Sequence, residues 1–523
     1  MQERAVRANA IFTEEDDRLD QLLNAASYNR KNLYNFFGFK PVLVERKHEP
    51  VEIVGELPAD LIGVYLRNGA NPQFDPSFSR RHMFDGPGML HQIQITKQGA
   101  SYSNTFVRTP RFEFEQMAGR EVFPSMGEMV SAGPLFIEKM KLVEEKRKKG
   151  IVPSLELDGV YSATAVQPCA GRIFCLNESG YPFGVNAKRD KGRLVLDGTG
   201  AFETWDGRLT SAFSAHPVID PETEDFYSLT LGRHSGNVDA CHVSKGELVQ
   251  NCSVSSFDPA RGRMAWLHEC LLTRNFIVFP DISMRLDQKA LLGPDGSMFA
   301  FDPNYKMRWG VLPRSFGPGT EARWFETDRP GAIWHLINAW EQESPSGQSE
   351  IVIYAPRFES YPPDMPIHTP AEGHAYLNKW VLNLDSGGVS EDRKLLDWGY
   401  ERTSFNTAYR GRRNRYAYLL DEQRAGYMGK GVLKYDLLEE KEVGYFDYGE
   451  FFGGEALFVP RAGGVDEDDG YLLDLLMTDN KAELIVIDAR SLQALAHLKL
   501  PGRVPFGVHA CWMDERVVSA LRT

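Results

Sequence analysis

The sequence has few of the features that define several common protein classes. Its 523 residues include only six cysteines, and no two of them form a CxxC pair. Scattered cysteines in a chain of this size are typical of buried, reduced thiols. No run approaches the roughly 18 apolar residues that a membrane-spanning helix requires. Segment 1–23 has acidic residues and no apolar core, so we expect no signal or transit peptide and a cytoplasmic location.

Several catalytic motifs are also missing. The sequence contains no GxSxG elbow, no P-loop, no HExxH and no GxGxxG after a strand. The net charge of −13 argues against nucleic acid as a partner, because phosphate binding needs clustered lysine and arginine. No pattern in the chain indicates an obligate protein partner.

Short strand-like segments dominate the chain after about residue 50. They are rich in aromatic and β-branched residues and are bounded by Gly, Pro, Asn or Asp, and the 47 glycines and 30 prolines supply the turns. Examples are GVYLRNG (63–69), GRIFCLNES (171–179), NFIVFPD (275–281), EIVIYAPRF (350–358) and RYAYLLDE (415–422). This pattern predicts a sandwich, a barrel or a propeller.

A repeat favours the propeller. The strand-like segments WVLNLD, VLKYD and LIVID end at Asp385, Asp436 and Asp488, so they are spaced by 436 − 385 = 51 and 488 − 436 = 52 residues. Each runs into a polar turn. A period near 50 built of hairpins is typical of propeller blades, and six to eight blades fit the chain length.

Helices are expected only in insertions. Residues 12–24 predict a short polar helix within an N-terminal extension, 1–50, and residues 133–149 predict a longer helix within a partly helical insertion, 110–150. We expect the whole chain, 1–523, to form a single domain with these helices capping one face. The longer helix has Phe136, Met140 and Val143 on one side, so it either packs on the propeller or lies in a membrane surface.

Four histidines lie in strand-like contexts far apart in the chain. His216, His268, His335 and His509 are separated by 52, 67 and 174 residues. No two of the twelve histidines have a local metal-ligand spacing, so a histidine metal site has to be assembled from distant strands. The inner strands of a propeller bring such residues together. Taken singly, each histidine is better explained as a hydrogen-bonded core or surface residue. The spacing alone does not decide between that explanation and a metal site.

The sequence motifs around the four histidines favour the metal site. From about residue 50 to the end, the chain resembles the carotenoid cleavage oxygenases, which include carotenoid and epoxycarotenoid cleavage dioxygenases, stilbene-cleaving enzymes and the retinal isomerohydrolase. The resemblance lies in VYLRNGANPQF (64–74), HMFDGPGMLH (82–91), SAHPVIDPET (214–223), WHLINAWE (334–341), GGEALFVPR (453–461), DEDDGYLL (466–473) and PGRVPFGVHACW (501–512). It implies a seven-bladed β-propeller with Fe²⁺ held on its axis by four histidines, which match His216, His268, His335 and His509.

The resemblance also implies three glutamates that support the histidines. It pairs Glu178 with His268, Glu401 with His335 and Glu455 with His509, and leaves His216 without a carboxylate. Neutral imidazoles suit Fe²⁺ and leave coordination positions for O₂, and their second N–H normally binds a carboxylate or carbonyl. The neighbours of Glu401 depart from the family's usual Glu-Phe-Pro pattern.

The implied reaction is cleavage of a carbon–carbon double bond of an apolar polyene by O₂, giving two carbonyl products. The protein then supplies an apolar tunnel that selects the bond, and we expect Phe106, Phe174 and Trp334 in its walls. A carotenoid or apocarotenoid is the expected substrate, with peripheral contact between the protein and a membrane.

Three alternatives stay open. Stilbene-cleaving relatives hold a phenol with a tyrosine and a lysine, and the matching positions here are Phe106 and Arg172, which disfavours a phenol. A propeller that serves only as a binding scaffold predicts no iron. Isomerisation without O₂ needs long membrane-contacting segments that the sequence does not clearly contain.

Overall fold

β-strands dominate the fold. A computed structural model of the protein describes residues 11–25, 37–74, 81–232, 237–256, 264–286, 292, 297, 299–361, 373–424, 428–507 and 509–522. Within these residues the strands form several antiparallel sheets and the helices are few and short, so the prediction of an all-β protein is confirmed. Residues 1–10 and 26–36 of the predicted N-terminal extension lie outside the described residues.

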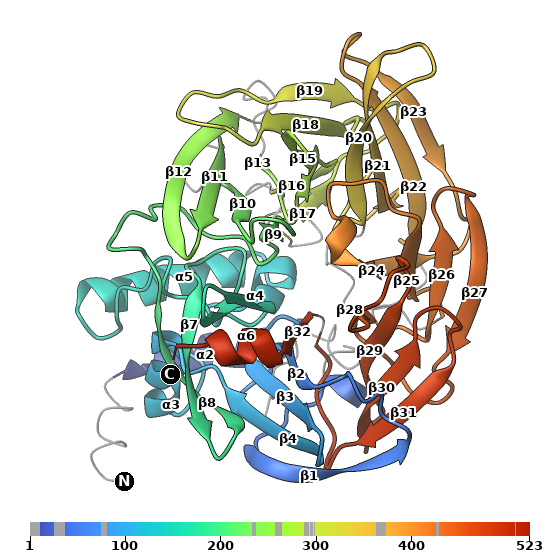
Figure 1. The fold of residues 1–523 in the computed structure, drawn as a ribbon. Coiled ribbons are helices and arrows are strands. Elements are labelled where there is room, and N and C mark those ends of the chain that lie inside the picture. The colour runs from blue at the N-terminus through green and yellow to red at the C-terminus, as the bar shows by residue number, and fades with distance from the viewer. Residues whose placement is uncertain are drawn as a thin grey trace.

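The sheets are arranged around a common centre in a propeller-like ring (Figure 1). Five of them have four strands each. They are β5 (Ala165–Cys169), β6 (Arg172–Leu176), β7 (Phe183–Asp190) and β8 (Arg193–Phe202); β9 (Val218–Ile219), β10 (Phe226–Leu231), β11 (Asn237–Ser244) and β12 (Glu247–Ser256); β14 (Leu271–Leu272), β15 (Phe276–Asp281), β18 (Arg308–Pro313) and β19 (Arg323–Glu326); β20 (Asn338–Glu343), β21 (Ser349–Phe358), β22 (Ala375–Asn383) and β23 (Val389–Lys394); and β24 (Tyr400–Ser404), β25 (Tyr416–Asp421), β26 (Gly431–Asp436) and β27 (Lys441–Asp447).

A nine-stranded sheet joins the two ends of the chain. Its strands, in spatial order, are β28 (Leu457–Pro460), β29 (Gly470–Met477), β30 (Ala482–Asp488), β31 (Ala494–Lys499), β1 (Arg46–Gly55), β4 (Gly99–Phe106), β3 (Met89–Thr96), β2 (Gly63–Arg67) and β32 (Ala510–Asp514). The N-terminal strand β1 pairs with β31, and the C-terminal strand β32 pairs with β2. These two pairings close the ring, because they attach strands from both ends of the sequence to each other. A small sheet contains β13 (Met264–Ala265), β16 (Met284–Leu286) and β17 (Phe299–Phe301).

The repeat with a period of 51 to 52 residues corresponds to equivalent strands. Its three copies lie in or at the end of β22, β26 and β30, and each of these is the third strand of four consecutive strands. Each is followed by an antiparallel partner, β23, β27 or β31. The repeated pattern therefore reports the same hairpin in three consecutive structural units.

The described helices are α2 (Glu14–Ala25), α3 (Pro110–Ala118), α4 (Met126–Ser131), α5 (Pro134–Lys148) and α6 (Glu515–Ala520), with 3₁₀ turns η3 (Phe37–Phe39) and η6 (Thr407–Tyr409). Helices α3 to α5 lie between β4 and β5 in the chain and stand together at one side of the ring (Figure 1). Ser125 caps α4 through a capping box with Glu128, which satisfies two backbone N–H groups that the helix leaves open.

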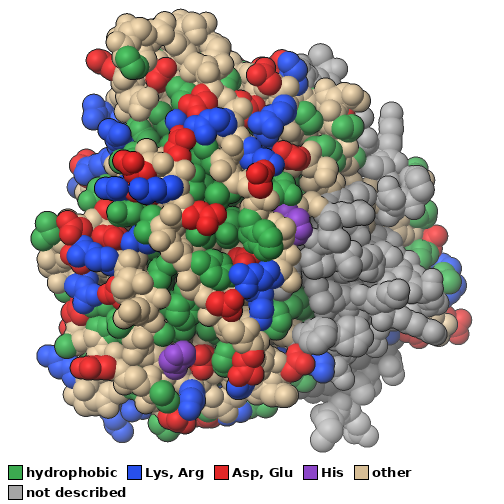
Figure 2. Space-filling model, turned by 90° about the vertical axis from the view of Figure 1, so that its right-hand side faces the viewer, with side chains coloured by type: hydrophobic (Ala, Val, Ile, Leu, Met, Phe, Trp, Pro, Cys, Tyr) green, Lys and Arg blue, Asp and Glu red, His purple; other side chains and the backbone are tan. Residues whose placement is uncertain are grey.

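None of the described helices is both long enough and apolar enough to cross a membrane. On the face shown in Figure 2, basic and acidic side chains are intermingled and hydrophobic side chains lie between them.

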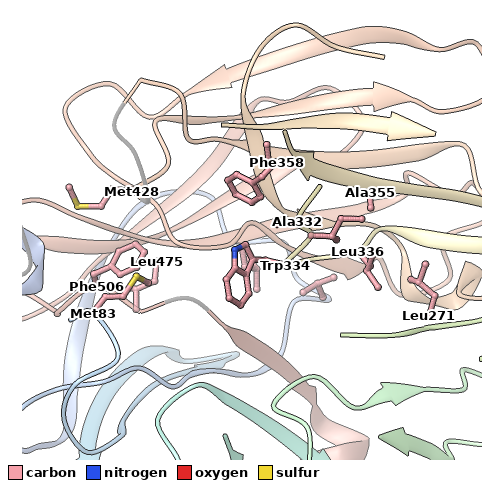
Figure 3. Packing of buried hydrophobic residues seen from close by; sticks show 14 of the residues in the cluster. Met83, Leu271, Ala332, Trp334, Leu336, Ala355, Phe358, Met428, Leu475 and Phe506 are labelled. Atoms are coloured by element: carbon pink, nitrogen blue, oxygen red, sulfur yellow. The ribbon is translucent and has the colours of Figure 1, made fainter. Parts of the chain in front are cut away.

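The largest buried cluster links the sheets near the centre of the molecule, and Figure 3 shows part of it with the indole of Trp334 near the middle. Trp309 and Trp380 belong to the same cluster. Both are completely buried, and their rings meet edge to face with centroids 5.2 Å apart. Such contacts between β18 and β22 join neighbouring sheets.

We expect Trp380→Ala to lower the free energy of unfolding by about 3–5 kcal/mol, because it removes a large buried ring and leaves a cavity. Urea unfolding followed by fluorescence and circular dichroism measures the change. Val465→Ala is the control, since Val465 is 86% exposed and its loss is expected to change stability by no more than about 0.5 kcal/mol. Equal midpoints for the two variants would contradict the assignment of Trp380 to the core.

Candidate metal centre

The four histidines lie just before the strands at the inner edges of their sheets. His216 precedes β9, His268 precedes β14, His335 precedes β20 and His509 precedes β32. Each of these strands is the edge strand of its sheet, and β9, β20 and β32 lie toward the centre of the ring in Figure 1. The fold therefore carries four side chains from distant parts of the sequence to one place.

The imidazoles form a compact cluster. One ligand nitrogen from each histidine lies within 4.8 Å of those from the other three. The Nε2 atom of His335 is 3.4 Å from Nε2 of His268 and 3.3 Å from Nε2 of His509. The ring of His216 completes the group, with its centroid 4.4 Å from that of His268 and 4.2 Å from that of His509.

Burial favours the neutral, metal-binding form of these side chains. Desolvation and the neighbouring histidines hold the pKa values of His216 and His509 well below the ordinary value. The Nε2 atom of His216 is buried and has no hydrogen-bond partner among the described residues. A buried imidazole nitrogen without a partner is costly unless a ligand binds it. Four imidazole nitrogens gathered at one place fit a divalent transition-metal ion.

Three glutamates lie behind three of the histidines, in the pairing that the resemblance implies. Nδ1 of His268 is 2.8 Å from Glu178, Nδ1 of His335 is 2.5 Å from Glu401, and Nδ1 of His509 is 3.2 Å from Glu455. A carboxylate that accepts the Nδ1–H leaves the Nε2 lone pair directed at the centre. For His216, the described residues provide no such carboxylate, and its backbone N–H donates to Ser214 Oγ.

The three carboxylates have different electrostatic environments. Burial alone would raise the pKa of Glu401, but the charge and hydrogen bond of His335 outweigh it and lower the pKa to about 2. Glu178 shows the same opposition, and hydrogen bonding to His268 keeps its pKa below the ordinary value. For Glu455 burial dominates and raises the pKa to about 7. Glu401 is thus the most firmly ionised of the three.

A buried aspartate supports the segment that carries Glu455. In β29, Asp474 accepts hydrogen bonds from the Tyr448 hydroxyl at 2.7 Å and from the Gly454 backbone N–H at 3.1 Å. Burial raises the pKa of Asp474 to about 6. Between pH 4 and 6 Asp474 therefore keeps its proton in the folded protein but has lost it in the unfolded chain. This difference in proton binding contributes to the free energy of unfolding, and the contribution is lost as the pH rises through 6.

We expect the free energy of unfolding of the wild type, relative to that of Asp474→Asn, to fall as the pH rises from 4 to 7. Asparagine does not titrate, and the other ionisable groups are the same in both proteins. The pH dependence of the difference therefore comes from Asp474. Urea unfolding of both proteins at several pH values measures this difference. A difference independent of pH would show that Asp474 keeps an ordinary pKa in the folded protein.

A cavity of about 120 Å³ opens on the histidine cluster. His268, His335 and His509 form part of its wall, and aromatic and other apolar side chains form much of the remainder. These apolar residues are Met83, Phe84, Met126, Trp266, Trp334, Phe358 and Tyr361. The polar contribution comes from Thr164, Asn177, Ser179, Arg402 and Glu422, together with Glu178 and Glu401.

Of the three predicted tunnel residues, Trp334 lines this cavity, whereas Phe106 and Phe174 are not among its described lining residues. Phe106 packs on Phe112, and Phe174 packs on Trp205 in the core between two sheets. Their place in the wall of a substrate tunnel stays a prediction. Arg172 pairs with Glu203 instead of reaching the cavity.

Sequence reasoning missed Trp266, Tyr361, Arg402 and Glu422 in the cavity wall. A local signal existed for one of them. Arg402 follows Glu401 where the resemblance leads one to expect an apolar residue, and a charge at such a place calls for a buried partner. The other three lie in ordinary strand-like contexts, and only the tertiary structure brings them to the cavity.

A second cavity of about 570 Å³ lies under α5. Phe136, Met140 and Val143, the apolar side of the predicted helix, line it. It shares Phe84, Met126, Asn177 and Ser179 with the cavity at the histidines. The apolar side of α5 therefore faces a cavity that shares part of its wall with the cavity at the histidines.

A propeller-like ring of sheets that gathers four histidines beside an apolar cavity defines a protein that could hold a metal ion at the centre of the ring. The chain matches the family described as retinal pigment epithelial membrane protein over residues 39–514, and it belongs to this family of carotenoid cleavage oxygenases.

Three similar proteins illustrate the relationship. The carotenoid 9,10(9′,10′)-cleavage dioxygenase of Crocus sativus is 31% identical over 506 residues, which cover 91% of this chain and 88% of that protein. The lignostilbene dioxygenase of Pseudomonas brassicacearum has a similar fold, with a TM-score of 0.76, 21% identity and coverage of 94% of this chain and 100% of the other. Cobalt-substituted Synechocystis apocarotenoid oxygenase gives a TM-score of 0.71 at 22% identity, covering 92% and 98% of the two chains.

Proposed function

We propose that this protein is an iron(II)-dependent dioxygenase that cleaves a carbon–carbon double bond of a carotenoid or apocarotenoid. One alkene and one O₂ are consumed, the carbon–carbon double bond is broken, and each carbon leaves as a carbonyl with one oxygen atom. The observation that carries the proposal is the cluster of four histidines, three of which lie in the wall of a largely apolar cavity. The protein's membership of a family with carotenoid-cleaving relatives supports it.

Iron is proposed from the chemistry of the donor atoms. His216, His268, His335 and His509 would hold the ion, and Fe²⁺ accepts neutral imidazole ligands and keeps positions open for O₂. When bound, iron supplies the activation of oxygen. Glu178, Glu401 and Glu455 orient three of the imidazoles, and the buried cavity wall excludes water and fixes which double bond faces the histidines.

We also propose that the ring has seven blades. Five are the four-stranded sheets, and dividing the nine-stranded sheet between β31 and β1 gives two more. The small sheet of β13, β16 and β17 then forms an insertion beside the blade that begins with β14. In this arrangement every blade starts at the centre, which supports a site on the propeller axis.

The substrate is proposed from the lining of the cavity and from the relatives. Trp266, Trp334 and Phe358 offer aromatic surface for a conjugated chain, while Tyr361, Asn177 and Thr164 offer polar groups for an oxygenated end. The plant relative is named for cleavage of a carotenoid. A stilbene is the second candidate, because a lignostilbene dioxygenase has a similar fold.

The decisive experiment loads the protein with Fe²⁺ without oxygen and then adds O₂ and one substrate at a time. The panel contains C40 carotenoids, shorter apocarotenoids and resveratrol, and mass spectrometry identifies the products. We expect carbonyl products from carotenoids or apocarotenoids, with ¹⁸O from labelled O₂ in both fragments. Turnover of resveratrol instead would establish the second candidate. No carbonyl product from any substrate would favour a binding scaffold.

We further propose a cytoplasmic protein that contacts membranes peripherally to collect its apolar substrate. The cavity under α5, lined by Phe136, Met140 and Val143, supports this entry route, and Met140 is 48% exposed. Sedimentation with phosphatidylcholine vesicles tests the contact. Complete recovery of the protein in the supernatant at all lipid concentrations would rule it out.

A further inference from the structure

We infer that Arg402 and Glu422 are positioning residues of the metal centre. Their ion pair holds the backbone of Arg402 in a conformation that turns its N–H onto Glu401, and Glu401 in turn orients His335. The inference rests on the proposed function, because it assumes that His335 binds a metal ion.

The backbone at Arg402 is strained. Its φ angle is 41°, in the left-handed region that residues with a side chain rarely adopt. The pairing of β24 with β25 shifts here, since Glu401 lies opposite Leu420 and Thr403 lies opposite Leu419. Arg402 is therefore the extra residue of a β-bulge. Bulges of this kind redirect side chains next to functional sites. A strained bulge also needs neighbouring contacts that hold its backbone in place.

A buried ion pair provides that hold. The Nη2 atom of Arg402 is 2.6 Å from Oε1 of Glu422, at the end of β25, and the two side chains are only 2% and 11% exposed. The guanidinium also lies over the ring of Phe506, 5.1 Å from its centroid. Removing either partner would leave a buried charge uncompensated, so the pair resists rearrangement.

The bulge places a backbone donor on the glutamate behind His335. The N–H of Arg402 donates to Oε2 of Glu401 at 2.6 Å, and the same oxygen is 2.5 Å from Nδ1 of His335. The other oxygen, Oε1, accepts the backbone N–H of His335 at 3.2 Å. With both oxygens engaged, the Glu401 carboxylate cannot rotate freely. The imidazole is consequently kept with Nε2 toward the other histidines.

The sequence after Glu401 also departs from the pattern that the resemblance implies. The residues after Glu401 are Arg-Thr, where the resemblance leads one to expect Phe-Pro. An arginine brought into an apolar cavity wall would be unfavourable without Glu422, and both residues lie in that wall. Holding the bulge at Arg402 in place is a role that explains why these two charged side chains are buried.

A matched pair of variants tests the backbone step. Arg402→Ala and Arg402→Gly both remove the ion pair and both leave Glu422 alone, but only glycine adopts the left-handed conformation without strain. The metal-free protein is titrated with Co²⁺, and its visible absorption and competition with a chelator give the affinity. We expect Arg402→Ala to weaken Co²⁺ binding by about 10-fold or more, and Arg402→Gly to stay within about threefold of the wild type.

Asp392→Asn is the control for the loss of a buried arginine–carboxylate pair elsewhere. Asp392 pairs with the buried Arg357 at 3.1 Å, and neither residue is among those lining the cavity at the histidines. This variant is expected to unfold more easily while binding Co²⁺ as the wild type does. If the single variants do not fold, the same alanine and glycine substitutions in a Glu422→Gln background remove the lone carboxylate and are compared in the same way.

The outcomes separate this inference from the proposed function. A wild-type protein that does not bind Co²⁺ or Fe²⁺ would overturn the proposed function. A wild type that binds, with Arg402→Ala and Arg402→Gly equally tight or equally weak, would overturn the inference alone. The Co²⁺ absorption bands give a further readout. Bands that are shifted in Arg402→Ala but return to the wild-type position in Arg402→Gly would show that the environment of the metal, and not merely the stability of the fold, depends on the bulge.

Discussion

Replacing His335 with alanine is expected to abolish metal binding and cleavage. His335 lies against two other members of the cluster, with its Nε2 atom 3.4 Å and 3.3 Å from those of His268 and His509. Outer partners of metal ligands typically contribute about 10- to 100-fold to metal affinity, so we expect at least about a 100-fold loss for a ligand itself. Elemental analysis of the purified protein and mass spectrometry of the products measure the two effects.

His242→Ala is the matched control. His242 also lies near a carboxylate, with Nε2 2.9 Å from Asp225, and it stacks on the ring of Tyr227. It does not belong to the cluster, so its variant is expected to keep the metal and the activity. A His335→Ala protein with full metal content and undiminished product formation would show that His335 does not hold the metal.

Glu401→Gln is expected to have the second-largest effect, lowering metal affinity by about 10- to 100-fold. Both carboxylate oxygens face N–H groups, from the His335 backbone and ring and from the Arg402 backbone. A glutamine side chain replaces one acceptor with an NH₂ donor, so one of these N–H groups meets another donor. The imidazole of His335 is then free to rotate. Titration of the metal-free variant with Co²⁺ measures the loss.

Glu455→Gln provides the comparison. Glu455 lies 3.2 Å from Nδ1 of His509, a longer contact than that of Glu401, and burial raises its pKa to about 7. A carboxyl group that is already partly protonated at neutral pH loses less when it is replaced by an amide. The expected order of metal affinity is therefore wild type, then Glu455→Gln, then Glu401→Gln. The reverse order of the two variants would show that the short contact at Glu401 does not control the site.

The general architecture was predictable because it depends on local patterns. Alternating apolar residues and turn residues define strands wherever they occur, and the period of 51 to 52 residues marks the same hairpin in consecutive units. The helices are likewise local: residues 12–24 were predicted and α2 spans Glu14–Ala25, and residues 133–149 were predicted and α5 spans Pro134–Lys148. The role of the apolar side of α5 was not predictable, because it depends on what lies beneath the helix.

The sequence predicted Trp334 in the cavity wall, but it gave no signal for most of the other lining residues. Trp334 lines it, but Phe106 and Phe174 face other parts of the core. In a strand the direction of a side chain changes with every residue, so an error of one position in register reverses the assignment. Hydrophobicity alone does not distinguish a ring that faces a ligand from one that packs between sheets.

By itself, the sequence determined that this chain is an all-β protein of the carotenoid cleavage oxygenase family, and it singled out four histidines and three glutamates as candidate residues. Only the tertiary structure decided that the inner edges of the sheets bring these side chains within a few ångströms of one another, and that Arg402 and Glu422 stand behind one of them. The reason is physical. Composition and periodicity are properties of neighbouring residues, whereas a metal centre depends on distances between residues up to about 290 positions apart, which arise only when both ends of the chain pair and close the ring.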